Sequence, residues 1–252
     1  MIETVENADV QQVSSENALV IAVSHSAVFG AEGEVQEAGV AFPLVQAIQR
    51  VNERLLQLDS SGSESLQFEV VLICTNGAQR DQVQTRTRDH GLQIHRFSFS
   101  GEDDFIDSLL KNRVHLFLTT DSNAASQAAN KGVFSALLDP LSACGPSEQL
   151  RVMFCGDAML DPSSEVKTGS HQASQVFWSH LGKIRQKFGA VDSPLSLVLL
   201  SSQRDINSCC RALQSLRTLG VNVDEAYCLG GSPRKPMMSL LRPHFLLGAP
   251  EE

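Results

Sequence analysis

Short apolar runs alternate along the chain with longer stretches in which apolar residues recur every three or four positions. The first pattern is typical of buried β-strands and the second of helices that pack one face on a sheet. The expected strands are residues 18–23, 68–74, 94–99, 114–118, 134–138, 150–154, 195–200, 225–229 and 244–247. The expected helices are residues 41–56, 103–110, 123–130, 175–188, 205–219 and 237–241. Strands separated by helices predict an α/β fold, a doubly wound and mostly parallel sheet with helices on both faces.

The two ends of the chain show little of this pattern. Residues 1–16 are polar and unpatterned, so we expect a disordered tail followed by a single α/β domain over residues 17–252. Residues 1–9 are too acidic and polar for a signal peptide, and no apolar run approaches the roughly 20 residues that span a bilayer. We therefore expect a cytoplasmic protein that does not enter a membrane. No internal repeat is apparent in the sequence.

Charge and cysteine usage narrow the class of partner. The 252 residues are 42% hydrophobic and carry a formal net charge of -9. A surplus of carboxylates argues against a nucleic acid polymer as partner, because a phosphate backbone requires clustered Lys and Arg; nucleotide monomers stay open. The six cysteines lack Cys-x-x-Cys spacing, so we expect neither a disulfide framework nor a zinc site. We interpret Cys209 and Cys210 as core residues of a helix, and His25, His95 and His115 as structural histidines.

The apolar run that begins at Leu150 ends in a polar loop with Cys155, Gly156 and Asp157. Ligands of open α/β sheets bind beyond the carboxyl ends of the strands, so this loop is the first candidate for a functional site. The sequence Phe-Cys-Gly-Asp-Ala over residues 154–158 resembles the Phe-Asp-Gly-Asp-Ala loop of the type I cytosolic 5'-nucleotidases, which are haloacid dehalogenase-like phosphatases. Cys155 stands where that family has its first Asp, which is its nucleophile.

Further stretches resemble the same family, in the same order, along most of residues 17–247. They are residues 22–29, 41–45, 72–76, 211–217, 224–226 and 242–244. Agreement at several collinear places is more specific than one motif. The resemblance implies a haloacid dehalogenase-like, Rossmann-like sheet and the Mg²⁺-dependent hydrolysis of nucleoside 5'-monophosphates such as AMP.

The resemblance also assigns roles to individual residues. Asp157 matches the general acid/base and a Mg²⁺ ligand, Ser201 matches the hydroxyl that holds the phosphoryl group, and Arg234 matches the cation. Substrate-binding roles fall on Ser24, Thr75, Asn76 and Lys235. Because strand ends meet at one edge of a parallel sheet, we expect several of these side chains to converge there. They are Ser24, Thr75, Asn76, Asp157, Ser201 and Arg234.

Three features of the family's site are altered in this sequence. Cys155 replaces the nucleophile, and Gly248 and Ala249 fall where the family has the acidic pair that helps to bind Mg²⁺. Mg²⁺ prefers oxygen ligands, for which a thiol is a poor substitute. The chain between Asp157 and Gln175 is shorter than in the family, which implies a reduced cap over the substrate. We therefore predict a catalytically degenerate member with a nucleotide-binding or regulatory role.

Other functions remain open at this point. One is an active Mg²⁺-dependent 5'-nucleotidase; another is a protein-interaction module that forms an oligomer with itself or with an active paralogue. Residues 74–80 also fit the Cys-x-x-Gly-x-x-Arg loop of cysteine phosphatases, in which a low-pKa thiolate attacks phosphate. Because Ile73 and Asp81 depart from that pattern, we interpret Cys74 as the last core residue of its strand. Asp121 is interpreted as a loop cap.

Overall fold

The computed structural model describes residues 2–12, 16–30, 38–58, 66–75, 79–139, 148–156 and 168–248. The strands are β1 (Glu3–Glu6), β2 (Ala18–Ser24), β3 (Gln67–Cys74), β4 (Arg96–Phe99), β5 (Leu116–Thr119), β6 (Ser135–Leu137), β7 (Leu150–Cys155), β8 (Leu195–Ser201), β9 (Glu225–Cys228) and β10 (Phe245–Leu247). The helices are α1 (His25–Phe29), α2 (Phe42–Leu58), α3 (Arg80–Asp89), the 3-10 turn η1 (Glu102–Asp104), α4 (Phe105–Lys111), α5 (Ser122–Asn130), α6 (Thr168–Gln186), α7 (Ile206–Thr218) and α8 (Lys235–Leu241).

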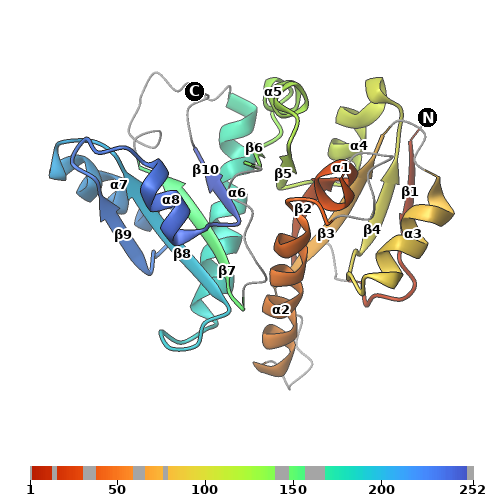
Figure 1. Cartoon of the computed structure of the whole chain (residues 1–252), viewed down its shortest axis with the longest axis horizontal. Coiled ribbons are helices and arrows are strands. Elements are labelled where there is room, and N and C mark those ends of the chain that lie inside the picture. Colours follow the sequence, from red (N-terminus) through yellow and green to blue (C-terminus); the bar gives the residue numbers. More distant parts are fainter. Residues whose placement is uncertain are drawn as a thin grey trace.

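The described strands form two sheets that lie side by side (Figure 1). The six-stranded sheet has the order β1-β4-β3-β2-β5-β6, and the four-stranded sheet has the order β10-β7-β8-β9. All neighbours run parallel except β1 and β4, which are antiparallel. The facing edge strands β6 and β10 contact one another without pairing. We expected one sheet, but no backbone pairing joins β6 to β10, and the described strands form two sheets. Both edge strands are short, with three residues each, and each pairs with one neighbour only.

One hydrophobic core extends across both sheets. The alternating residues Leu19, Ile21 and Val23 of β2 pack into it together with Val152 and Phe154 of β7. Successive side chains of a strand point to opposite faces, so the intervening residues of β2 and β7 pack into two smaller clusters on the other faces. Both faces of each sheet are therefore buried, which explains why the central strands are almost continuously apolar.

Helices cover both faces of the sheets. On the shared face, α2 presents Leu44, Ile48, Val51 and Leu55, whose spacing of three or four residues places them on one side of the helix. It contacts both β3 and β7 and so bridges the two sheets (Figure 1). On the other faces, α4 and α5 pack on the six-stranded sheet and α8 on the four-stranded sheet. The predicted α/β class with helices on both faces is confirmed.

The amino-terminal segment differs from our expectation of a disordered tail over residues 1–16. Glu3–Glu6 form β1 at the edge of the six-stranded sheet, where Thr4 pairs with Ser98 of β4. The side-chain amide of Asn7 continues this attachment by donating to the carbonyl oxygen of Ile94 at 2.8 Å. An edge strand is held mainly by its backbone hydrogen bonds, so it needs no apolar pattern that a sequence could reveal.

Two other features were not expected from the sequence. Helix α3 was missed because Val83 and Thr87 are its only buried residues, which leaves almost no apolar periodicity. Cys209 of α7 and Cys228 of β9 form a disulfide, so our expectation of unpaired cysteines was wrong for this pair. No helix in the described ranges is both long enough and apolar enough to cross a membrane.

Candidate functional site

The candidate site begins where β7 ends, in the interior of the four-stranded sheet. β7 lies between β8 and β10 and is parallel to both, which confirms the prediction for the strand that contains Phe154. Cys155 is the last residue of β7 and is 1% exposed. The backbone amide of Gly156 donates to the carbonyl oxygen of Leu200 at 2.9 Å. This hydrogen bond ties the start of the loop to the end of β8.

Close packing requires glycine at position 156. A Cβ atom there would lie 3.2 Å from the Cβ of Ser201 and 3.3 Å from the Cβ of Ala212 in α7. These distances are tighter than ordinary van der Waals contact. The loop therefore leaves β7 directly against β8 and α7, and Cys155 and Ser201 lie at one edge of the sheet.

The predicted cation lies beside the end of β8. Ser201 ends this strand and is 1% exposed. The hydroxyl of the next residue, Ser202, accepts hydrogen bonds from Nε and Nη2 of Arg234 at 3.3 and 3.2 Å. Arg234 is the residue that precedes α8, and the neighbouring Lys235 is exposed. The structure therefore brings Arg234 to the same edge as Cys155 and Ser201.

The strand ends of this sheet are a poor match for Mg²⁺. Gly248, which follows β10, offers no side chain, and Cys155 offers only sulfur, whereas Mg²⁺ prefers hard oxygen ligands. Asp157 and Ala249 lie outside the described residues. Within the described part of the chain, no group of three or more His, Cys, Asp or Glu side chains could hold a metal ion. The described side chains at this edge are thus, by themselves, a poor set of ligands for Mg²⁺.

Two other predicted residues lie elsewhere. Ser24 at the end of β2 and Thr75 after β3 line one cavity of the six-stranded sheet. Asn76 lies outside the described residues. Because β5, β6 and β10 lie between β2 and β7, Ser24 and Thr75 are brought together with each other but not with Cys155 and Ser201.

The cysteine-phosphatase hypothesis fails at Cys74. This residue is 2% exposed at the end of β3, and burial raises the pKa of its thiol to about 12. A nucleophilic thiol needs the opposite shift, toward the thiolate at neutral pH. Arg80, which would hold the phosphate in such a loop, instead donates to Glu3 at 2.9 Å. The interpretation of Cys74 as a core residue is confirmed.

One residue that sequence analysis did not assign to this edge helps to build it, and a second fastens the same sheet at its other edge. Cys228 pairs in register with Ser201, so its disulfide with Cys209 fastens α7 to the sheet next to the predicted hydroxyl. At the opposite edge, where β7 and β10 begin, Nδ1 of His244 accepts a hydrogen bond from the backbone amide of Arg151 at 3.0 Å. Burial lowers the pKa of His244 to about 4, which keeps the imidazole neutral and able to accept. Neither partner could be identified from spacing along the sequence.

Comparison with known proteins gives a human relative by sequence. The chain is 30% identical over 243 residues to human cytosolic 5'-nucleotidase 1B, a match that covers 85% of this chain and 39% of that protein. The chain thus spans about two fifths of the length of this relative. Among solved structures, it matches an O-GlcNAc transferase mutant from Thermobaculum terrenum with 11% identity and a TM-score of 0.25, covering 90% of this chain and 47% of that one. That likeness is too slight to bear on fold or function.

The family model described as 5'-nucleotidase matches residues 30–175 and 164–248. Together these segments run from α2 to β10 and include the loop after β7 but not β1 or β2, so the match does not rest on a single motif. The chain belongs to the 5'-nucleotidase family.

Proposed function

We propose that this protein binds a nucleoside monophosphate such as AMP at the edge formed by β7 and β8, with little or no hydrolysis. The observation that carries the proposal is Cys155, a buried thiol at the position that the family resemblance gives to the attacking carboxylate. The phosphoryl group would then meet a binding site without its usual nucleophile. Such a protein would sense or sequester a nucleotide rather than consume it.

Binding is supported by the groups that remain at this edge. A guanidinium can hold two phosphate oxygens at once, and Arg234 already lies beside the end of β8 through its contact with Ser202. Lys235 adds a second positive charge, and Ser201 adds a hydroxyl. These groups can bind a phosphoryl oxygen whether or not a metal is present.

Hydrolysis is disfavoured by two independent losses. A carboxylate at position 155 would serve both as nucleophile and as an oxygen ligand for Mg²⁺, and a thiol supplies no oxygen ligand. Gly248 removes a further carboxylate from the end of β10. Removing both functions lowers metal occupancy as well as the rate of attack, so each loss makes the other harder to compensate.

Restoring the carboxylates tests the loss of hydrolysis. Unmodified protein at millimolar Mg²⁺ should release no phosphate from AMP above a mock preparation, and Cys155→Asp alone should gain little. The triple variant Cys155→Asp, Gly248→Asp, Ala249→Asp should gain measurable activity, whereas the matched variant with Cys155→Ser should not. Gly248 has a φ of 78°, which Asp tolerates better than most residues, so a thermal melt must first show that the triple variant folds. Mg²⁺-dependent turnover by the unmodified protein would refute the proposal.

Calorimetry with AMP tests the binding itself. Arg234→Gln removes the guanidinium and should weaken AMP binding roughly tenfold or more, the effect expected for one charge-assisted hydrogen bond. Arg217→Gln is a matched control, because this exposed arginine lies in the last turn of α7, at the opposite end of the helix from the loop that follows β8. The absence of heat from AMP with the unmodified protein would refute nucleotide binding.

We also place the protein in the cytoplasm, the location given in the name of its human relative. The Cys209–Cys228 disulfide bears on this point, because the cytosol usually keeps such bonds reduced. Mass spectrometry of alkylated protein taken from cells without reductant measures the state of the pair. Two free thiols at these positions agree with a cytoplasmic location, and a fully formed disulfide argues for an oxidising compartment.

A further inference from the structure

The two sheets repeat one arrangement of strands. In the six-stranded sheet the parallel strands β2, β3, β4 and β5 follow one another in the chain and lie in the order β4-β3-β2-β5. In the four-stranded sheet β7, β8, β9 and β10 lie in the order β9-β8-β7-β10. Each half of the molecule therefore places its third, second, first and fourth strands in the same order. The repeat is a property of the fold that the sequence does not display.

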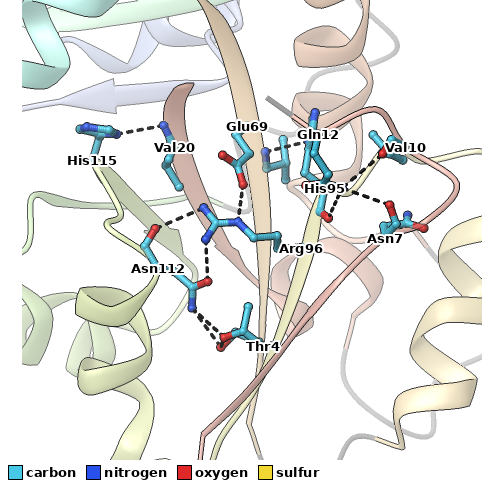
Figure 2. Close-up of polar contacts among 12 residues, drawn as sticks. Thr4, Asn7, Val10, Gln12, Val20, Glu69, His95, Arg96, Asn112 and His115 are labelled. Carbon is cyan, nitrogen blue, oxygen red and sulfur yellow. Dashed lines mark hydrogen bonds and ion pairs between the residues drawn. The ribbon is translucent and has the colours of Figure 1, made fainter. Parts of the chain in front are cut away.

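A histidine before the fourth strand recurs in both halves. Nδ1 of His115 accepts from the backbone amide of Val20 at 3.0 Å (Figure 2). The amide of His115 donates in turn to the carbonyl oxygen of Val20 at 2.9 Å. In the second half, Nδ1 of His244 accepts from the amide of Arg151 at 3.0 Å, and its own amide donates to the carbonyl oxygen of Arg151 at 2.9 Å. Val20 and Arg151 are thus equivalent positions on the first strands.

A side-chain acceptor before the third strand also recurs. Nδ1 of His95 accepts from the amide of Val70 at 3.1 Å, and Oδ2 of Asp224 accepts from the amide of Leu197 at 2.8 Å. The amides of His95 and Asp224 donate back to the carbonyl oxygens of the same two partners, at 3.0 and 2.7 Å. Val70 and Leu197 are therefore equivalent positions on the second strands.

These equivalences align the two strand-end edges residue by residue. Counting four residues on from Val20 and Arg151 pairs Ser24 with Cys155. The strand registers agree, because Ser24 lies opposite Ile73 and Cys155 lies opposite Leu200, each three residues on from the second anchor. The edge formed by β2, β3 and β5 is thus the counterpart of the proposed nucleotide site in the other half.

A cavity of about 540 Å³ opens at this counterpart edge. This volume is within the range of small-molecule sites. The hydroxyl of Ser24 is buried at the cavity and has no hydrogen-bond partner among the described residues. A buried hydroxyl without a partner is rare in folded proteins, and a polar ligand would satisfy it. Thr75 and Thr119 add further hydroxyls to the wall.

The charge of the lining selects the ligand. Glu102 and Asp121 contribute carboxylates, and none of the described residues that line the cavity is Lys or Arg. A phosphate dianion would be repelled here, whereas the hydroxyls of a ribose can donate to carboxylates. Asn123 and Gln127 can bond the polar edge of a base, and Phe117 supplies an apolar surface.

We propose that this cavity binds a nucleoside, the uncharged part of the family's nucleotide substrate, at a site separate from the one proposed above. The ribose hydroxyls lie against Asp121 and Glu102, and the base lies between Phe117 and the amides of Asn123 and Gln127. Ser24 bonds the ligand from the floor of the cavity. The two halves thus bind related ligands that differ in the phosphate.

Calorimetry with adenosine, guanosine and cytidine tests the proposal, and AMP competition tests its charge argument. At least one nucleoside should bind, and Asp121→Asn should weaken it roughly tenfold or more. Asn is a good helix cap, so this variant keeps the bond from Asp121 to the amide of Asn123 that begins α5. Gln127→Ala, on the exposed surface of α5, is a second variant that should weaken binding without disturbing the fold.

Arg234→Gln separates this proposal from the nucleotide site. Arg234→Gln should weaken AMP binding and leave nucleoside binding unchanged. Asp121→Asn should weaken nucleoside binding and leave AMP binding unchanged. Failure of AMP binding alone would leave the nucleoside site standing. Absence of binding by all three nucleosides, or nucleoside binding that responds to Arg234→Gln but not to Asp121→Asn, would overturn the inference. AMP displacing the nucleoside with equal affinity would also overturn it, because the carboxylates would then exert no selection.

Discussion

Acidification should destabilise this protein strongly, because three histidines are held as neutral hydrogen-bond acceptors. His95, His115 and His244 each accept from a backbone amide through Nδ1. Burial lowers the pKa of each to about 4 from the ordinary 6.5, with further lowering by Arg96, His180 and Arg151 respectively. Protonation would place an N–H group against another N–H group. These side chains therefore hold the start of β4, β5 and β10 only while they are neutral.

The sign and size of the effect follow from linkage. The folded pKa lies below the unfolded one, so the unfolded chain binds more protons, and stability falls as the pH drops from 6.5 toward 4. Between the unfolded pKa of 6.5 and pH 5, each histidine would lower the unfolding free energy by about 2 kcal/mol, at about 1.36 kcal/mol per pH unit. The three together would cost roughly 4 to 6 kcal/mol, the lower figure allowing for the partial exposure of His115. The total unfolding free energy of a typical domain is only about 5 to 15 kcal/mol.

Urea denaturation at pH 7, 6 and 5 measures this dependence. Asn is the appropriate replacement, because its Oδ1 can take the place of Nδ1 without titrating. The variants His95→Asn, His115→Asn and His244→Asn each remove one titrating group. Each should therefore reduce the slope of the unfolding free energy against pH by up to about 1.36 kcal/mol per pH unit, the contribution of one bound proton. The exposed His90 supplies the control variant His90→Asn. Glu69, whose pKa is raised by burial, is present in every variant and so cancels in the comparison. Equal stability of the unmodified protein at pH 7 and pH 5 would refute the reasoning.

Two further predictions concern the edge of the four-stranded sheet. Cys228→Ser should lower the unfolding free energy by about 3 kcal/mol in urea without reductant, since the disulfide to Cys209 closes a 19-residue separation; Cys210→Ser, which removes an exposed thiol, should have no such effect. Gly156→Ala should lower the unfolding free energy by about 1 to 3 kcal/mol through overpacking, whereas Gly189→Ala, where a Cβ would meet its nearest atom at 4.0 Å, should be well tolerated in the same urea titration.

The apolar pattern predicted the central elements well because these elements are buried and consist mostly of apolar residues. Residues 18–23 and 195–200 are apolar on both faces and form the central strands β2 and β8. The elements that were missed are stabilised by other means. β1 is held at a sheet edge by its backbone, and α3 buries only Val83 and Thr87. A method that reads periodicity has no signal in either case.

Long-range partners were beyond what the sequence could predict for the same reason. Cys209 and Cys228 carry no spacing rule, and only the return of β9 beside β8 brings them together. The buried pair of Glu69 and Arg96 is similar: Arg96 also donates to the side chain and backbone of Asn112, and these partners come from β3, β4 and the end of α4 (Figure 2). Their proximity depends on strand order, which the pattern of apolar residues leaves undetermined.

The set of site residues predicted from the sequence mixed two edges because the fold repeats itself. Ser24 and Ser201 each follow an apolar strand, and nothing in the sequence says that those strands belong to different halves. The structure separates them: Arg234 and Lys235 lie at the first edge, and Glu102 and Asp121 line the cavity at the second. A phosphate ester is favoured at the first edge and repelled at the second, while an uncharged nucleoside is repelled by neither. Charge would thus keep a nucleotide out of the second edge, while the hydroxyl and amide groups there would have to retain the nucleoside. Comparing Arg234→Gln with Asp121→Asn for both ligands therefore measures directly how the two halves divide them.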